Sequence, residues 1–116
     1  MKINIEELPE FQKDLKRLLK KYRTLDSDLE TVRKDLNDER DASPPYSFRI
    51  ENLGIITCII KIKKIASNSF KGRGVNSGFR LIYAYFEQDE RIVFIELYHK
   101  NEKENEDRKR ILQHFE

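Results

Sequence analysis

The apolar residues of this chain change their spacing at Pro44-Pro45, and that change limits the folds that are open to it. Before the two prolines, large apolar side chains recur every three or four residues, which is the spacing of an amphipathic helix. After them, apolar residues form β-branched runs or alternate with polar residues, as they do in strands. A helix cannot continue through the proline pair, because the residue before a proline is pushed out of the helical conformation. The sequence therefore predicts an α+β fold.

Two helices are predicted before the prolines. The first runs from about residue 9 to residue 22 and begins at Pro9, where a missing N–H costs little. The second runs from residue 24 to about residue 40, with Thr24 as a candidate N-cap. Only a short turn separates them, so we expect a helical hairpin that packs on one face of a sheet. Their apolar stripes are Leu8, Phe11, Leu15, Leu18 and Tyr22 in the first helix and Leu25, Leu29, Val32 and Leu36 in the second.

The rest of the pattern predicts an antiparallel sheet and a short C-terminal helix. Residues 79–86 and 92–98 are strongly apolar and adjacent, which predicts a central hairpin. The doublet Lys63-Lys64 interrupts an alternating run, so either a bulge lies there or one lysine points toward the core. A weakly docked helix from about residue 104 to residue 115 completes a single two-layer domain over residues 1–116. Further strands are expected at residues 2–5, 46–50 and 55–65.

Acidic and basic residues are segregated along the chain. The net charge is only +2, yet no Asp or Glu lies between Asn52 and Phe86. This segment carries six cations, which leaves 17 basic and 21 acidic residues in the rest of the chain. A segregated basic segment is typical of a surface that meets phosphate groups. The six cations are Lys61, Lys63, Lys64, Lys71, Arg73 and Arg80.

The sequence argues against a membrane or a secreted location. Its longest apolar run, at residues 55–60, is far shorter than the ~20 residues that cross a bilayer. Glu6 and Glu7 stand where a signal peptide would be apolar. The one cysteine, Cys58, cannot form an internal disulfide. We therefore expect a cytoplasmic protein.

Metal and thiol chemistry have no support in the sequence. Cys58, His99 and His114 stand apart, without the spacing of metal ligands, so neither a metal nor another cofactor is expected. Cys58 lies among isoleucines, which is typical of a core cysteine rather than a nucleophile. Gly72-Arg73-Gly74 lacks the ending of a phosphate-binding loop, so a nucleotide site is not expected either.

The basic segment has the residue types that RNA cleavage requires. Attack by the RNA's own 2′-hydroxyl needs a base, cations for the phosphorane oxygens and an acid for the leaving oxygen. A lysine can act as the base when neighbouring positive charge lowers its pKa, and Lys61, Lys63 and Lys64 are close enough in sequence to do this to one another. The alternative is that these lysines only solvate an edge strand and deter aggregation.

Four motifs, in this order, resemble the RelE/HigB branch of the type II toxins. They are Ile65-Ala66-Ser67, Lys71-Gly72-Arg73-Gly74, Ser77-Gly78-Phe79-Arg80-Leu81-Ile82-Tyr83 and Tyr98-His99-Lys100-Asn101-Glu102. The strong part of the resemblance spans about residues 60 to 106, and the helical hairpin agrees in kind. The resemblance implies a RelE-like fold, in which an N-terminal helical hairpin packs on an antiparallel sheet with a short C-terminal helix.

The resemblance also implies a function. Toxins of this branch cleave mRNA, usually on the ribosome and without a metal, and a cognate antitoxin protein neutralises them. Matching positions imply that Lys64 or Lys61 is the base, Arg80 stabilises the phosphate, Lys100 binds phosphate or acts as the acid, and Tyr98 stacks or orients the RNA. Glu102 is expected to support Lys100. Further RNA contacts are expected from Lys63, Lys71, Arg73 and His99, although His99 can equally be an exposed strand-end histidine without a role.

Two other functions remain open. A ParE-like protein uses the same fold to inhibit DNA gyrase and needs no catalytic basic cluster, which Lys64, Arg80 and Lys100 together argue against. A degenerate relative would bind RNA without cleaving it. Catalysis on one phosphate requires that Lys61, Lys64, Arg80 and Lys100 converge on one exposed concavity of the sheet.

Overall fold

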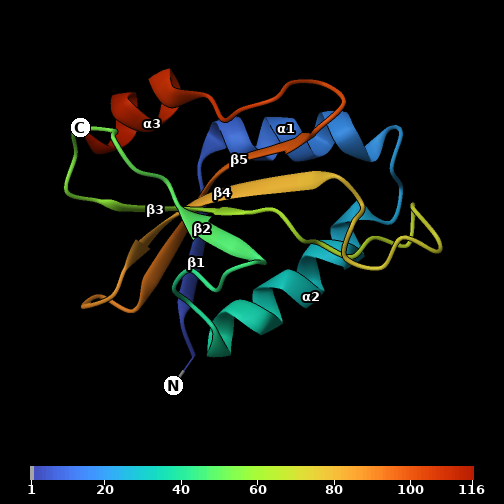
Figure 1. Ribbon diagram of the computed structural model, residues 1–116, viewed down its shortest axis with the longest axis horizontal. Helices are drawn as coiled ribbons and strands as arrows, with labels where there is room; N and C mark the ends of the chain where they lie inside the picture. The colour runs from blue at the N-terminus through green and yellow to red at the C-terminus, as the bar shows by residue number, and fades with distance from the viewer. Residues whose placement is uncertain (1) are drawn as a thin grey trace.

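The computed structural model describes residues 2–116, and in that range it has a five-stranded sheet and three helices (Figure 1). The strands lie side by side in the order β1-β5-β4-β3-β2, which places β4 at the centre. None of the helices in this range is long and apolar enough to cross a membrane. In chain order the elements are β1 (Asn4–Glu7), α1 (Pro9–Leu19), α2 (Leu25–Asp38), β2 (Ser47–Arg49), β3 (Cys58–Ile62), β4 (Phe79–Phe86), β5 (Arg91–His99) and α3 (Arg108–Phe115).

The sheet is mixed, because β1 pairs with β5 in parallel while all other neighbours are antiparallel. The expectation of a wholly antiparallel sheet is therefore wrong at this one edge. A period of two predicts a strand but carries no information on the direction of its partner. The chain passes from β1 directly into α1, which packs against β5, so β1 is laid beside β5 with Asn4 opposite Arg91.

The helical hairpin covers one face of the sheet, as the sequence predicts. Phe11 and Leu18 of α1 and Leu25 and Leu29 of α2 are almost completely buried against it. Helix α1 ends at Leu19 rather than at the predicted Tyr22, which instead lies in the turn between the helices. The strand residues that this core contains are Ile60, Ile62, Phe79, Leu81, Tyr83, Ile92, Phe94 and Leu97.

Helix α3 packs against the opposite face, so the molecule has three layers rather than the expected two. Ile111 is fully buried there, and Arg110 forms an ion pair of 2.8 Å with Asp14 of α1. The helix begins only at Arg108, after Asp107 accepts a capping hydrogen bond of 3.1 Å from the backbone of Arg110. One buried isoleucine and a partly buried ion pair therefore hold this short helix on the sheet.

A β-bulge in β5 decides which side chains face α3. Ile82 lies opposite Glu96 and Tyr83 lies opposite Phe94, so Ile95 is an extra residue on β5. The extra residue shifts the alternation by one position. As a result Glu96 and Tyr98 face α3 instead of the helical hairpin.

Gly78 lies just before β4 in a conformation that only glycine adopts easily, with φ at +97°. A Cβ atom there would lie 2.6 Å from Nε2 of His99, which is closer than real side chains approach. We therefore expect Gly78→Ala to lower the free energy of unfolding by at least about 1 kcal/mol, measured by urea denaturation.

The matched control for this change is Gly54→Ala. Gly54 also has a positive φ, +73°, but no heavy atom lies within 4 Å of the added carbon. The control therefore carries the backbone strain without the clash. Equal losses of stability in the two variants would show that contact with His99 does not constrain Gly78.

Candidate functional site

The six cations of the acid-free segment differ in how they are neutralised. Of these six, only Lys61 has a carboxylate partner within residues 2–116, and that partner is Glu106, at 3.1 Å. Arg80 instead donates to the backbone carbonyl of Lys63 at 2.9 Å. Five of the six positive charges are therefore not cancelled by an ion pair, and they are available to an anionic ligand.

Three of the predicted catalytic residues share the face of the sheet that α3 covers. Arg80 on β4 lies directly opposite Tyr98 on β5. Lys61 on β3 lies opposite Ile82, and its ammonium is 5.8 Å from the centre of the Tyr98 ring. The sheet register therefore brings Lys61, Arg80 and Tyr98 onto one face of the sheet.

The environment of Lys61 is the opposite of the one predicted for a general base. Its side chain is only 13% exposed and lies between Tyr98 and Glu106. Burial alone would lower the pKa of Lys61, but the Tyr98 hydroxyl and the Glu106 carboxylate together raise it above the usual value. The expectation that neighbouring lysines lower this pKa is therefore wrong, because a carboxylate from a distant part of the chain lies closer.

Tyr98 is almost completely buried, and two ammonium groups lie near its ring. Lys103 is 5.0 Å from the ring centre, and Lys61 is 5.8 Å from it. The Tyr98 hydroxyl is buried and makes no aligned hydrogen bond with any of residues 2–116. Burial raises the pKa of this hydroxyl, so it stays protonated at neutral pH and has a proton to donate.

Two carboxylates complete this cluster, and both were missed in the sequence. Glu96 is 3% exposed in its side chain, forms an ion pair with Lys103 and accepts a hydrogen bond of 2.8 Å from the backbone of Asp107. Glu106 pairs with Lys61, which is 45 residues away along the chain. The first could have been suspected as a lone carboxylate within an apolar strand, whereas no sequence pattern marks the second.

Lys63 and Lys64 diverge at the end of β3. Both of their backbone N–H groups donate to the carbonyl of Tyr46, at 2.9 Å and 3.3 Å. Two residues facing one is the pattern of a bulge, which is one of the two alternatives for this doublet. The ammonium of Lys63 lies 5.8 Å from the ring centre of Phe48, whereas that of Lys64 donates to Asn76 at 2.7 Å.

Lys64 consequently lies apart from the cluster around Tyr98. It lines a hollow of about 490 Å³ beside α2, together with Lys71. Lys100 is exposed just after β5, and its N–H donates to the carbonyl of Gly78 at 2.9 Å. The expected single concavity is not the observed arrangement, because Lys61 is covered by α3 and its preceding segment while Lys64 faces the α2 side.

The loop that carries Lys71 and Arg73 is tied to α2 by a buried aspartate. Asp28 is 5% exposed and accepts hydrogen bonds from the Ser67 hydroxyl at 2.6 Å and the Asn68 backbone at 3.2 Å. A buried carboxylate with several donors is costly to remove, because its loss would leave those donors unpaired. Asp28 therefore fixes the base of a loop whose tip presents exposed cations.

His99 lies in the core rather than at the surface. It is 1% exposed and packs against the rings of both Tyr22 and Phe70, at 5.8 Å and 5.1 Å between centres. Nε2 lies 2.9 Å from the Ser77 carbonyl, and Nδ1 accepts from the backbone of Asn101 at 3.2 Å, so Nε2 carries the proton. The expected exposed histidine is therefore wrong, and this ring has no free face for RNA.

Glu102 does not support Lys100, contrary to the expectation. Its carboxylate pairs with Arg17 of α1 and accepts a hydrogen bond of 3.0 Å from the backbone of His99. Cys58 is half-buried, and burial raises the pKa of its thiol, which makes a thiolate nucleophile less accessible. Within residues 2–116 no three His, Cys, Asp or Glu side chains are grouped so that they could hold a metal ion.

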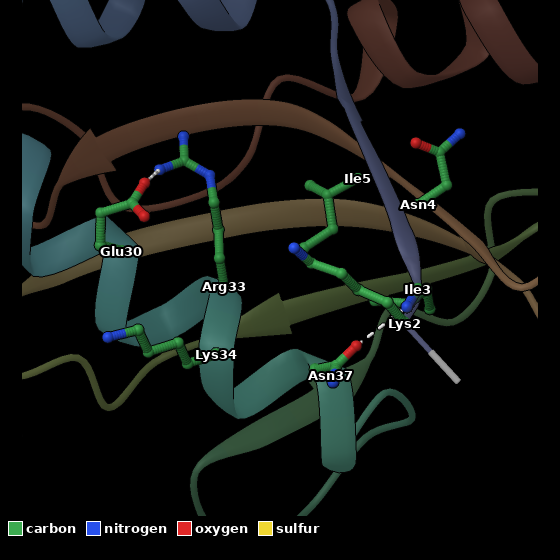
Figure 2. Close-up of a pocket in the computed structure, with 8 residues that line it drawn as sticks. All are labelled: Lys2, Ile3, Asn4, Ile5, Glu30, Arg33, Lys34 and Asn37. Carbon is green, nitrogen blue, oxygen red and sulfur yellow. Dashed lines mark hydrogen bonds and ion pairs between the residues drawn. The ribbon is translucent and has the colours of Figure 1, made fainter.

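A separate hollow of about 710 Å³ lies between β1 and α2 (Figure 2). Arg33 in its wall is paired with Glu30 at 2.5 Å and with Glu7 at 2.6 Å, and Asn37 accepts from the backbone of Ile3 at 2.9 Å. These contacts attach β1 to α2. None of the predicted site residues lines this hollow.

Neither a protein-family model nor a curated protein sequence matches the chain. The fold matches a chain of the crystal structure of the archaeal RelE–RelB complex from Pyrococcus horikoshii OT3, with a TM-score of 0.59. The two sequences are 15% identical, and the match covers 89% of this chain and 100% of that one. The chain therefore has the RelE-like fold that the four motifs indicate.

The Lys61–Glu106 pair makes a specific contribution to the pH dependence of stability. Burial alone would raise the pKa of Glu106, but hydrogen bonds from its own backbone and from Lys61 lower it below the usual 4.5. A carboxyl whose pKa is lowered on folding stabilises the fold above 4.5, and this stabilisation is lost as the pH falls through the folded value. We expect Glu106→Gln to be less stable than the wild type at pH 7 and to approach it at pH 3.

Urea denaturation of both proteins at several pH values measures this difference. Glu104→Gln is the matched control, because Glu104 is exposed on the same segment and has no ion pair among the described residues. A stability difference for Glu106→Gln that stays constant between pH 7 and pH 3 would contradict the proposed strength of the pair.

Proposed function

We propose that this protein is the toxin of a type II toxin–antitoxin system and that it cleaves mRNA on the ribosome without a metal. The observation that carries the proposal is the placement of Arg80, Tyr98 and Lys61 on one face of a RelE-like sheet. Four further cations of the acid-free segment that have no ion pair among residues 2–116 accompany them. This work would take place in the cytoplasm, where mRNA is translated.

In the proposed reaction the 2′-hydroxyl of the RNA attacks the adjacent phosphate, and the 5′-oxygen leaves. Arg80 stabilises the phosphorane, because its guanidinium has no carboxylate partner within residues 2–116 and projects from the strand beside Tyr98. Lys100 binds the phosphate or protonates the leaving oxygen. Tyr98 orients the RNA by stacking or through its buried hydroxyl, which makes no aligned hydrogen bond within residues 2–116.

The two lysines that were candidates for the base now have different roles. Lys61 has a raised pKa and is held by Glu106, so we assign it to charge stabilisation. Lys64 is the remaining candidate for the base, and its side chain must turn from the α2 side toward Arg80 to reach the reacting phosphate. The Lys64 ammonium now donates to the side-chain oxygen of Asn76 at 2.7 Å. Binding of RNA to the Asn76 side chain would release this ammonium.

The remaining cations bind the RNA backbone outside the reacting phosphate. Lys63 is exposed beside Phe48, and Lys71 and Arg73 are exposed on the loop that Asp28 anchors. Exposed lysines and arginines that contact only the RNA backbone supply affinity that depends on salt, but they take no part in catalysis. His99 has no part in this scheme, because it is buried.

Arg80→Ala tests catalysis separately from RNA affinity. If Arg80 stabilises the phosphorane, single-turnover cleavage at saturating enzyme should slow by 10²-fold or more, about 3 kcal/mol, while ribosome binding stays nearly unchanged. Lys71→Ala should do the reverse, with weaker binding, a smaller salt dependence and an unchanged chemical step. The reaction should continue in the presence of a chelator.

Mapping of mRNA ends on translating ribosomes provides the matching functional readout. Cuts that depend on Arg80 support the proposal. Inhibition of gyrase with intact mRNA would identify a ParE-like function, and ribosome or RNA binding without cuts would identify a degenerate relative. An unchanged rate for Arg80→Ala, or loss of activity with a chelator, would remove the catalytic assignment.

We further propose that a cognate antitoxin protein binds and neutralises this chain. The complex of RelE with RelB in the structure that shares this fold supports that proposal. Expression of the protein alone should arrest growth, and coexpression with the product of the adjacent reading frame should relieve the arrest and yield a complex that co-purifies. Harmless expression without any neighbouring partner would count against a toxin.

A further inference from the structure

The segment between β5 and α3 covers two of the residues that the proposed function requires. This segment, residues 100–107, is called the strap below; it has no regular helix or strand. Beneath it Tyr98 is 1% exposed, and the side chain of Lys61 is 13% exposed. RNA cannot reach either side chain while the strap stays in this position.

The strap is held by charge rather than by apolar packing. All eight of its residues are polar, and six of them carry a charge. Among residues 2–116, four ion pairs attach it to the rest of the protein: Arg17 with Glu102, Glu96 with Lys103, Lys61 with Glu106, and Arg110 with Asp107. Such contacts are weakened by salt and can be exchanged for contacts with another anion.

The carboxylate of Glu106 occupies a position that suits a phosphate group. It is 3.1 Å from the Lys61 ammonium, which in turn faces the ring of Tyr98. A phosphodiester has the same charge as a carboxylate and accepts the same hydrogen bonds. The Tyr98 hydroxyl, buried without an aligned hydrogen bond, is a donor that such a phosphate would satisfy.

We propose that Glu106 is an internal competitor of RNA, which occupies a phosphodiester-binding position at Lys61 and Tyr98 until the strap lifts. This inference rests on the proposed function, because RNA is its ligand. It adds a regulated subsite to that function. While the strap is closed, RNA cannot reach Lys61 and Tyr98. When the strap lifts, an RNA phosphate replaces the Glu106 carboxylate as the partner of Lys61. No covalent step is involved.

Access to Lys61 can be measured without RNA. Brief acetylation with a water-soluble N-hydroxysuccinimide ester, read by mass spectrometry, compares Lys61 with the exposed Lys63 of the same molecule. The wild type should show strong protection of Lys61, and Glu106→Gln should raise its labelling several-fold relative to Lys63. Glu104→Gln should behave as the wild type. Equal labelling of Lys61 in Glu106→Gln and the wild type would overturn the proposal.

Binding of RNA gives the second readout. The probe is a fluorescein-labelled, single-stranded 2′-O-methyl oligoribonucleotide, which has no 2′-hydroxyl to attack and therefore cannot be cleaved. Glu106→Gln should bind it about three-fold or more tightly than Glu104→Gln, which loses the same charge but not the contact with Lys61. Equal affinities of the two variants would overturn the role of Glu106 as a competitor.

A measurement on the wild type decides the case in which Glu106→Gln does not fold. Amide hydrogen exchange within residues 101–106 should become faster when the oligonucleotide binds, because the strap lifts. Unchanged or slower exchange at saturating oligonucleotide would overturn the proposal. If the wild type binds RNA neither on ribosomes nor as the oligonucleotide, the proposed function itself is overturned. The acetylation experiment uses no RNA, so its result does not depend on the proposed function.

Discussion

The pairing of β4 with β5 at the centre of the sheet is the interaction on which the rest of the structure depends. One face of this pair lies against the helical hairpin, and the other lies against α3 and Ile111. A strand that is covered on both faces has no exposed side for a charged residue. A charged residue in such a strand must therefore be paired, or it must lie beyond the part of the strand that the helices cover. Glu96 shows the first solution, with Lys103 and the Asp107 backbone as partners. Arg80 shows the second, near the end of β4.

That constraint separates the cations into two groups. Lys61 lies within β3 under the strap, and its charge is matched by Glu106. Lys63, Lys71 and Arg73 lie beyond the strands, where water solvates them and no carboxylate is needed. The same acid-free segment therefore supplies one buried, compensated cation and several open ones. Only the open ones can attract an RNA backbone from a distance.

Much of the fold follows from the sequence, because the apolar spacing there is strong. The bounds of β4 agree to the residue, and both helices of the hairpin were predicted with ends shifted by at most three residues. The direction of β1 and the docking of α3 were not predictable in this way. They depend on contacts across the molecule, such as that between Arg110 and Asp14, which leave no period in the sequence. The candidate site divides similarly. The pairing of the strands that carry Arg80 and Tyr98 follows from the hairpin, but the bulge that aligns these two residues, the partner of Lys61 and the burial of His99 do not.

The way in which the strap is attached also explains how it could move without unfolding the protein. One end is fixed where His99 packs in the core, and the other is fixed where Asp107 caps α3 and Ile111 anchors the helix. Between these two points the strap buries no apolar side chain of its own, so lifting it exposes mainly the ring of Tyr98 and otherwise exchanges ion pairs and hydrogen bonds. Apolar burial holds α3 in place, while ion pairs and hydrogen bonds hold the strap over Tyr98. A polyanion acts on the second interaction and leaves the first intact, which makes the strap the part of this fold best suited to respond to RNA.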